Sequence, residues 1–406
     1  MTGGGRSMGR VLIRGVKPAL PAEGVADRVV DVSIAADGRI ERVGPAIEPQ
    51  AQEMQVDAEG AYISPAWADL HTHIYHGATD IGVRASDAGL ARGVATLVDA
   101  GSAGEANVEG FLEFVTGRST EEVYAFLNVG SIGLVACNRV SELTSVHSID
   151  ADRLLDAVDR HRSVIRGLKV RASHVILGDW GITPVRVAKQ LSRIASLPLM
   201  VHVGEAPPLL DEVLDLLDEG DVVTHCFHGK RGASIGEDDR LFQAMVDAAG
   251  RGVRLDVGHG GASFSFSVAK RALDRGLVPY TISTDLHQHN IAGPVWDLGT
   301  TMSKLLNLGM PLTGVLEAVT FHPWRILGLG ERAAGWLRAG TLARFTLFRI
   351  EEVSLEAPDS AGGRERLSRF ILPRYTVVGT EVVEASSTGH EALRSRRDGA
   401  RRENDR

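Results

Sequence analysis

Long apolar runs recur through the middle of the chain, and most of them are followed by an amphipathic stretch. Runs that are apolar without alternation are typical of strands buried on both faces of a parallel sheet. Eight such runs occupy about 270 residues, which matches the repeat number and size of a (β/α)8 barrel. They read YISPAWADLHTH, GVATLVDAG, YAFLNVGS, VIRGLKVRA, LPLMVHVG, DVVTHCFHG, VRLDVGHGG and PYTISTDLH.

The amphipathic stretches between these runs predict helices. They include SIDADRLLDAVDRHRSVI, APPLLDEVLDLLDEG and EDDRLFQAMVDAAGRG, and Asp150 and Pro207 are suitable residues for helix starts. A doubly wound open sheet is the alternative, but it normally carries a glycine-rich phosphate loop. The chain contains neither GxGxxG nor GxxxxGK[ST], so we predict an α/β (β/α)8 TIM barrel.

Both ends of the chain alternate apolar and polar residues, as half-buried strands do. RVLIRGVKPA and VVDVSIAADGRIERVG lie before the barrel, and GTLARFTLFRI and RYTVVGTEVVEA lie after it, separated by the polar loop APDSAGGRERLS. We therefore predict a barrel formed by residues 61–332. Residues 1–60 and 333–385, which precede and follow it in the sequence, are predicted to form one small β-sandwich satellite domain. Residues 386–406, which end in RSRRDGARRENDR, are predicted to be a disordered tail.

The composition favours a globular enzyme and disfavours a nucleic-acid-binding or membrane protein. Hydrophobic residues make up 44% and charged residues 24% of the 406 positions, which is typical of a globular enzyme. The formal net charge of −8 argues against nucleic-acid binding. The absence of a long apolar stretch argues against a membrane span, and the N-terminus has no signal-peptide pattern. Cys137 and Cys226 form no CxxC motif, so we expect a reducing, cytoplasmic location.

Candidate chemistry lies where the predicted strands end, because barrel active sites form at the C-terminal ends of the strands. The first run ends in His71 and His73, whose spacing points both imidazoles to one side of a strand. The polar residues of the fourth, fifth, sixth and eighth runs are Lys169, His202, His225 and Asp285. Taken alone, an HxH is more often a pair of partly exposed histidines than a metal site, and His202, His225 and Asp285 are each more typical of hydrogen-bonded barrel residues than of ligands.

Lys169 is the most informative of them, because the chain has six lysines against thirty-eight arginines and one of the six lies inside an apolar run. Burial penalises an ammonium and lowers its pKa. One interpretation is an ion-paired barrel lysine. The other is a neutral amine that reacts with carbon dioxide to give a carbamate able to bridge two metal ions.

With these residues, the chain resembles the amidohydrolase superfamily. DLHTH, Lys169, His202, His225 and Asp285 match its binuclear pattern in order and strand position, and the resemblance covers residues 10–385. GLKVRAS, VHVGEAP, THCFHGK and GHGGASFSF are similar to its dihydroorotase-like, or amidohydrolase/deacetylase, branch. Two departures stand out. Tyr75 replaces the arginine of the HxHxR of true dihydroorotases, and GTLARFTLF replaces the usual G-x-D-A-D turn.

The resemblance implies a binuclear hydrolase of an ester or amide bond in a small acylated carboxylic acid. His71, His73 and Asp285 would bind the more buried cation, His202 and His225 the second, and carboxylated Lys169 would bridge the two. Zinc is the default metal, although these ligands also accept manganese, iron or cobalt. A metal-bridged hydroxide would attack the carbonyl, and Asp285 would carry its proton to the leaving group. The resemblance also implies a homo-oligomer.

Substrate contacts are expected at the same mouth of the barrel. Arg171 lies two residues beyond Lys169 and could grip a carboxylate, although a structural salt bridge is an equal alternative. His259 lies between glycines that suggest a close approach of the backbone, and His287 and Asn290 lie on the loop after the eighth run.

Several other functions remain open at this stage: a cyclic amide hydrolase, a mononuclear deaminase on the same barrel, and a barrel that lost its metals and became a scaffold. Lys169 disfavours the deaminase, and the full ligand set disfavours the scaffold. GASIG at residues 232–236 matches the GxSxG of serine hydrolases. The serine lies in a polar loop rather than directly after a strand, so this match is disfavoured.

Overall fold

Seven parallel strands form the centre of the computed structural model, which describes residues 9–22, 25, 28–137, 139–143 and 145–404. Their order in the sheet is β12-β11-β10-β9-β8-β7-β6, so each strand lies beside its neighbour in sequence. All of them are buried along almost their whole length, as their apolar runs predict. The strands are β6 (Trp67–Thr72), β7 (Val94–Ala100), β8 (Glu122–Asn128), β9 (Ile165–Ala172), β10 (Leu199–Val203), β11 (Val222–Thr224) and β12 (Arg254–Asp256).

The eighth run closes the sheet into a barrel without forming a regular strand. Thr281 bridges to Asp256 at the end of β12, and Leu286 bridges to Thr72 at the end of β6, both in parallel. Between these two bridges, the backbone N–H of Thr284 donates to the side chain of Asp69 instead of to a neighbouring strand. The predicted (β/α)8 barrel is thus confirmed, with an irregular final segment.

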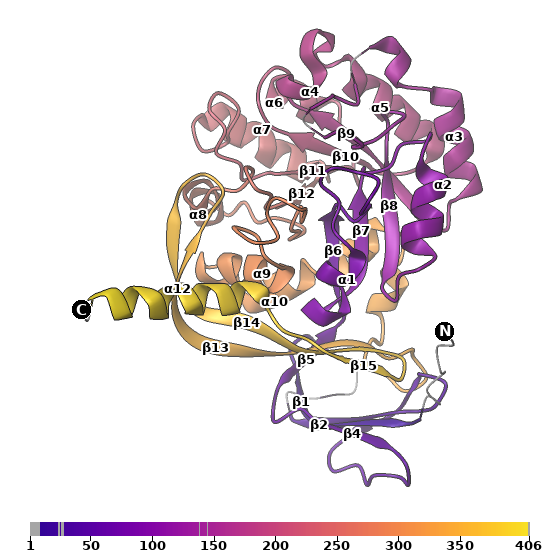
Figure 1. Ribbon diagram of the computed structural model, residues 1–406, viewed down its shortest axis with the longest axis vertical. Coiled ribbons are helices and arrows are strands. Elements are labelled where there is room, and N and C mark those ends of the chain that lie inside the picture. The colour runs from indigo at the N-terminus through magenta and orange to yellow at the C-terminus, as the bar shows by residue number, and fades with distance from the viewer. Residues whose placement is uncertain (1–8, 23–24, 26–27, 138, 144, 405–406) are drawn as a thin grey trace.

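Helices cover the outside of the barrel and complete its repeats (Figure 1). Asp150 caps α3, as predicted, by accepting the backbone N–H of Arg153 at 3.1 Å. The expected helix start at Pro207 is wrong, because α6 begins three residues later at Leu210. The helices of the barrel are α1 (Ala85–Ala88), α2 (Val108–Phe111), α3 (Ala151–Arg160), α4 (His174–Leu177), α5 (Thr183–Ala195), α6 (Leu210–Asp215), α7 (Asp239–Gly250), α8 (Phe266–Asp274), α9 (Leu298–Asn307), α10 (Leu312–Glu317) and α11 (Phe321–Ile326).

The satellite domain lies beside the barrel and combines both ends of the chain, as predicted (Figure 1). β13 pairs antiparallel with β5, which runs directly into the first barrel strand, so the two ends share one hydrogen-bonded path. The path runs β15-β14-β13-β5-β1-β2-β3, with β4 paired to β1. The bounds are β1 (Val11–Pro18), β2 (Val30–Ile34), β3 (Ile40–Gly44), β4 (Met54–Asp57), β5 (Tyr62–Pro65), β13 (Arg344–Pro358), β14 (Arg364–Val378) and β15 (Glu381–Glu384).

The β13–β14 hairpin is longer than its sequence suggests. The predicted polar loop at residues 357–368 is wrong for most of its length, because the strands continue and leave only residues 359–363 as the turn. The turn packs against the loop that follows β12 and against the start of α8: Ser360 Oγ accepts the backbone N–H of Phe264 at 3.1 Å, and Asp359 accepts that of Phe266 at 2.9 Å. The satellite domain therefore contacts the barrel at the C-terminal ends of its strands.

The C-terminal segment also differs from expectation. Residues 386–406 were predicted to be disordered, but Thr388–Asn404 form the helix α12, which extends beside the hairpin (Figure 1). Leu393 is buried, and His390 packs its ring 4.8 Å from that of Phe370. These contacts precede the charged end of the chain, where composition alone indicated a solvated tail. Among the described residues, no helix is long and apolar enough to cross a bilayer.

Candidate metal centre

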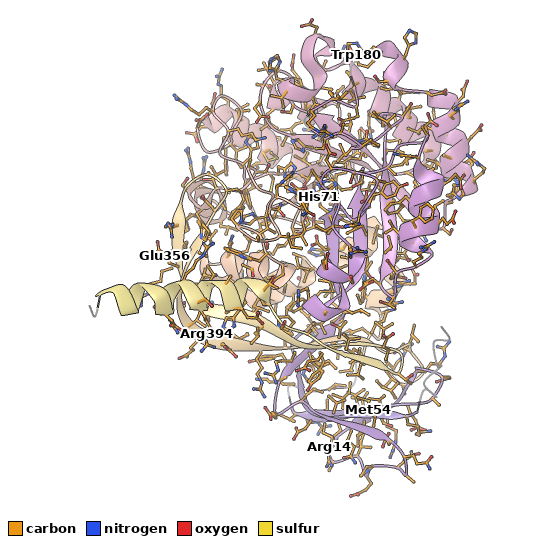
Figure 2. The ribbon with its side chains drawn as sticks, in the orientation of Figure 1. Arg14, Met54, His71, Trp180, Glu356 and Arg394 are labelled. Carbon is orange, nitrogen blue, oxygen red and sulfur yellow. The ribbon has the colours of Figure 1, made fainter. Side chains whose placement is uncertain are left out.

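The first cluster of side chains lies at the end of β6. His71 is the fifth residue of this strand and His73 follows its end, so both project to the same side. Asp285, from the segment that closes the barrel, brings its Oδ1 to 3.0 Å from His73 Nε2 and 3.3 Å from His71 Nε2. Figure 2 shows His71 at the end of β6, and its side chain is buried.

Lys169 enters the same cluster from β9 and is buried. Its Nζ lies 3.0 Å from His71 Nε2 and 3.3 Å from Met200 Sδ, and among the described residues it forms no ion pair with a carboxylate. Burial lowers the pKa of Lys169 to about 7. An amine with this pKa is partly neutral at physiological pH and can act as a nucleophile.

A pair of histidines from the next two strands completes the cluster. His202 Nδ1 on β10 lies 3.0 Å from Nε2 of His225, which directly follows β11. The ring of His225 is also 5.2 Å from that of His71, so the two halves of the cluster adjoin. One ligand atom from each of His71, His225 and Asp285 lies within 4.8 Å of the others.

Hydrogen bonds from the barrel orient the three imidazoles that point inward through Nε2. Thr224 donates its hydroxyl to Asp256 at 2.7 Å, so its oxygen is free to accept from Nδ1 of His71 at 2.9 Å. His225 Nδ1 donates to the carbonyl of Gly258 at 2.6 Å, and His73 Nδ1 lies 3.0 Å from the Ser102 hydroxyl. With Nδ1 engaged in this way, each Nε2 presents a lone pair to the centre.

The protonation states of the cluster suit metal binding. Burial holds the pKa values of His71, His202 and His225 well below that of free histidine, so these imidazoles are neutral at pH 7. Burial alone would raise the pKa of Asp285, but the neighbouring His71 and His73 bring it well below its ordinary value. Neutral imidazole nitrogens around an ionised carboxylate are a donor set that fits a divalent transition metal.

The cluster forms the floor of a cavity of about 420 Å³. His73, His202 and Asp285 line it, and so do Arg171 and His287, two of the residues expected to contact substrate. Such a volume accommodates a small organic molecule rather than a polymer.

Arg171 does line the cavity, but its guanidinium is already bound. Its Nε and Nη2 each donate to one oxygen of Glu142 at 2.7 Å, and both side chains are almost fully buried. The remaining terminal nitrogen lies 3.5 Å from the sulfur of Cys137. Arg171 therefore forms a structural salt bridge with Glu142, which is the alternative to a substrate contact that the sequence allowed.

His259 and Asn290 do not line the cavity. His259 is buried, stacks on Phe264 with ring centroids 4.6 Å apart and accepts a hydrogen bond from Lys304 at 2.8 Å. The close approach suggested by its flanking glycines is made to the metal centre, because a Cβ on Gly260 would lie 2.5 Å from Asp285 Oδ2. Asn290 donates to the backbone carbonyl of Asp285 at 2.8 Å, so it holds the loop that carries this carboxylate.

The cavity residues that the sequence analysis did not predict include three polar ones, Ser173, Glu205 and Lys230. Glu205 follows His202 by three positions, and Lys230 follows His225 by five. A charged residue shortly after a candidate ligand lies on a loop at the mouth of the barrel, and this proximity was a signal that could have found both.

The barrel and its buried cluster are typical of a metal-dependent barrel enzyme, and known proteins similar to this chain belong to the same class. A deacetylase of Agrobacterium fabrum is 53% identical over 376 residues, covering 93% of this chain and 92% of the relative. A solved structure described as a dihydroorotase shares 52% identity with a TM-score of 0.90, covering 93% of this chain and 98% of its own. Another, described as an adenine deaminase, shares 32% identity with a TM-score of 0.82, covering 92% and 99%.

No family model matches the chain. Identity above 50% over nearly the full length of both proteins nevertheless establishes common ancestry and fold. The chain belongs to the amidohydrolase superfamily of metal-dependent hydrolases.

Proposed function

We propose that the protein is a metal-dependent deacetylase that hydrolyses an ester or amide bond of a small acylated carboxylic acid. The observation that carries this proposal is the meeting of four imidazoles, a buried amine and an ionised carboxylate at the floor of one small cavity. The deacetylase relatives support the reaction type.

In the proposed centre, His71, His73 and Asp285 would hold one divalent cation, and His202 and His225 would hold a second. Lys169, once carboxylated, would supply a ligand shared by the two cations, and zinc is the proposed metal. When bound, such cations supply a water activated at neutral pH and polarise a carbonyl. A carbamate would also remove the cost of burying Lys169, because it would convert an amine that has no carboxylate partner in the described part of the chain into an anionic ligand.

Asp285 is the proposed proton carrier. Its low pKa keeps the carboxylate ionised before the reaction, and its Oδ1 lies at the junction of His71 and His73. It takes the proton of the attacking water and passes it to the leaving oxygen or nitrogen. His287, on the cavity wall, is proposed to contact the substrate.

Three alternatives have less support. Tyr75, at the position of the dihydroorotase arginine, points away from the cavity: it donates its hydroxyl to the carbonyl of Asn107 at 3.0 Å and packs on Phe111. The serine of GASIG, Ser234, donates to the backbone carbonyl of His228 at 2.7 Å rather than to an imidazole. A mononuclear deaminase has no use for a bridging Lys169.

A substrate panel tests the proposal. Metal-loaded enzyme is assayed with N-acetyl amino acids, O-acetyl hydroxy acids and cyclic amides, before and after chelation, and metal content is measured in parallel. We expect hydrolysis of acetylated acids, loss of activity with chelator, and about two metal ions per chain. Exclusive turnover of cyclic amides, deamination with one ion per chain, or activity that survives metal removal would each contradict the proposal.

The proposed location is the cytoplasm, which the two buried, unbridged cysteines support. The homo-oligomer stays a prediction.

A further inference from the structure

The cavity contains a second cation besides Arg171. Lys230 lies on the loop after β11, and its side chain lines the cavity with only 16% of its surface exposed. Its Nζ pairs with Glu205 Oε1 at 3.0 Å, and Glu205 in turn accepts a hydrogen bond from the Ser173 hydroxyl. Neither Lys230 nor its partners belong to the proposed metal ligands.

The ammonium of Lys230 lies beside the metal centre. A Cβ built on Gly204 would lie 3.0 Å from both Lys230 Nζ and Ser173 Oγ, and 3.4 Å from His202 Nε2. The three polar groups therefore surround one point at the backbone of Gly204, where a larger residue would displace them. A ligand that reaches His202 also comes close to Lys230.

The two cavity cations differ in how much of their hydrogen-bonding capacity is used. Arg171 has two of its nitrogens bound by the two oxygens of a carboxylate that is itself 1% exposed, so its charge is neutralised inside the protein. Lys230 has three N–H donors, and among the described residues one carboxylate oxygen pairs with it. Its partner Glu205 is 42% exposed, so solvent screens the negative charge more than the positive one.

We propose that Lys230 is the specificity-determining residue that binds the carboxylate of the substrate, and that Glu205 and Ser173 position its ammonium. This inference rests on the proposed function for the acylated acid as substrate. Burial raises the pKa of Glu205, but its hydrogen bonds to Ser173 and Lys230 outweigh that effect and lower the value to about 2, so Glu205 stays an anion that fixes the lysine. A substrate carboxylate accepts from the two remaining N–H groups of Lys230 while its acyl group faces the metal centre.

The test compares an acetylated acid with its primary amide, which has nearly the same size but no charge. For Lys230→Met, we expect KM for the acid to rise by about 10- to 100-fold, the effect of losing a hydrogen bond to a charged group. The kcat for the acid and both constants for the amide should stay within about twofold. Lys230→Arg should restore part of the preference for the acid. Lys270→Met, which removes an exposed lysine on α8, is the matched control and should change nothing.

The assignment would be overturned if Lys230→Met raised KM equally for the acid and the amide, because Lys230 would then only maintain the structure of the cavity. An unchanged KM for the acid would overturn it as well. Calorimetric titration of metal-loaded protein with the acid gives a second readout that needs no turnover. Binding that depends on Lys230 without hydrolysis would support this inference and contradict the proposed function. The inference would be refuted if Lys230→Met hydrolysed or bound the acid as well as the wild-type protein does. It would also be refuted if the wild-type protein did not bind the acid at all.

Discussion

The buried ion pair between Arg171 and Glu142 makes a quantitative prediction for Glu142→Gln. Both oxygens of Glu142 accept from Arg171 at 2.7 Å, and the two side chains are 8% and 1% exposed. Removing one partner of a pair at this depth leaves an uncompensated buried charge, which costs about 3–5 kcal/mol. An exposed pair is worth about 0–1 kcal/mol. We therefore expect Glu142→Gln to lower the free energy of unfolding by about 3–5 kcal/mol.

Equilibrium unfolding in urea, at constant metal loading, measures this change. Asp159→Asn is the matched control, because Asp159 accepts from Arg162 at the same 2.7 Å while both side chains are at least half exposed. We expect less than about 1 kcal/mol for the control. The double variant Glu142→Gln with Arg171→Met removes both charges and should be more stable than Glu142→Gln alone.

A loss of less than about 1 kcal/mol in Glu142→Gln would refute this reasoning, because it would mean that the guanidinium is not held by the protein. Arg171 would then be available to a ligand. The same result would weaken the case for Lys230 as the cation that binds the carboxylate.

Three further predictions concern the metal centre and its surroundings. Lys169→Ala should abolish turnover and lower metal content below two ions per chain, as measured by elemental analysis; unchanged turnover would contradict the bridging role. Lys304→Met should lower unfolding free energy by roughly 3 kcal/mol, because His259 Nε2 and the carbonyls of Pro294 and Pro358 lose a donor, and urea unfolding would show it. Metal-free protein should lose stability as pH falls below about 6.5, because histidines buried as neutral groups bind their protons only when the chain unfolds. A thermal midpoint that stayed constant from pH 8 to 5 would rule this out.

The sequence was sufficient to predict the barrel and to group the candidate metal ligands. Both predictions follow from the local apolar pattern and from the rule that the C-terminal ends of barrel strands meet. Apolar runs mark parallel strands, and the C-terminal ends of those strands meet at one mouth. His71, Lys169, His202 and Asp285 could thus be grouped across more than two hundred positions. The eighth run is strand-like in sequence, but its backbone bonds partly to side chains such as Asp69, which the apolar pattern does not reveal.

The substrate side of the cavity was harder to predict, because it depends on pairing between loops. Nothing in the neighbourhood of Arg171 shows that Glu142, twenty-nine residues earlier, takes its guanidinium. The glycines beside His259 predicted a close approach of the backbone to a substrate, but Gly260 makes room for Asp285 and Gly258 makes room for Thr224 and His225. A single sequence shows which residue type stands at the end of a strand. The partner that occupies the hydrogen bonds of that residue can be identified only from the three-dimensional structure.

The β13–β14 hairpin shows why the satellite domain belongs to the same functional unit as the barrel. Lys304 on α9 donates at 2.8 Å to His259 Nε2 and to the carbonyls of Pro294 and Pro358, so one buried ammonium joins the loops after β12 and after the eighth barrel segment to the end of β13. The Ser360 hydroxyl adds a bond to the carbonyl of His259 at 3.2 Å. Because Gly260 packs directly on Asp285, a shift of this loop would move the carboxylate that is proposed to carry the proton. The hairpin therefore holds, from outside the barrel, the loop whose Gly260 packs on Asp285.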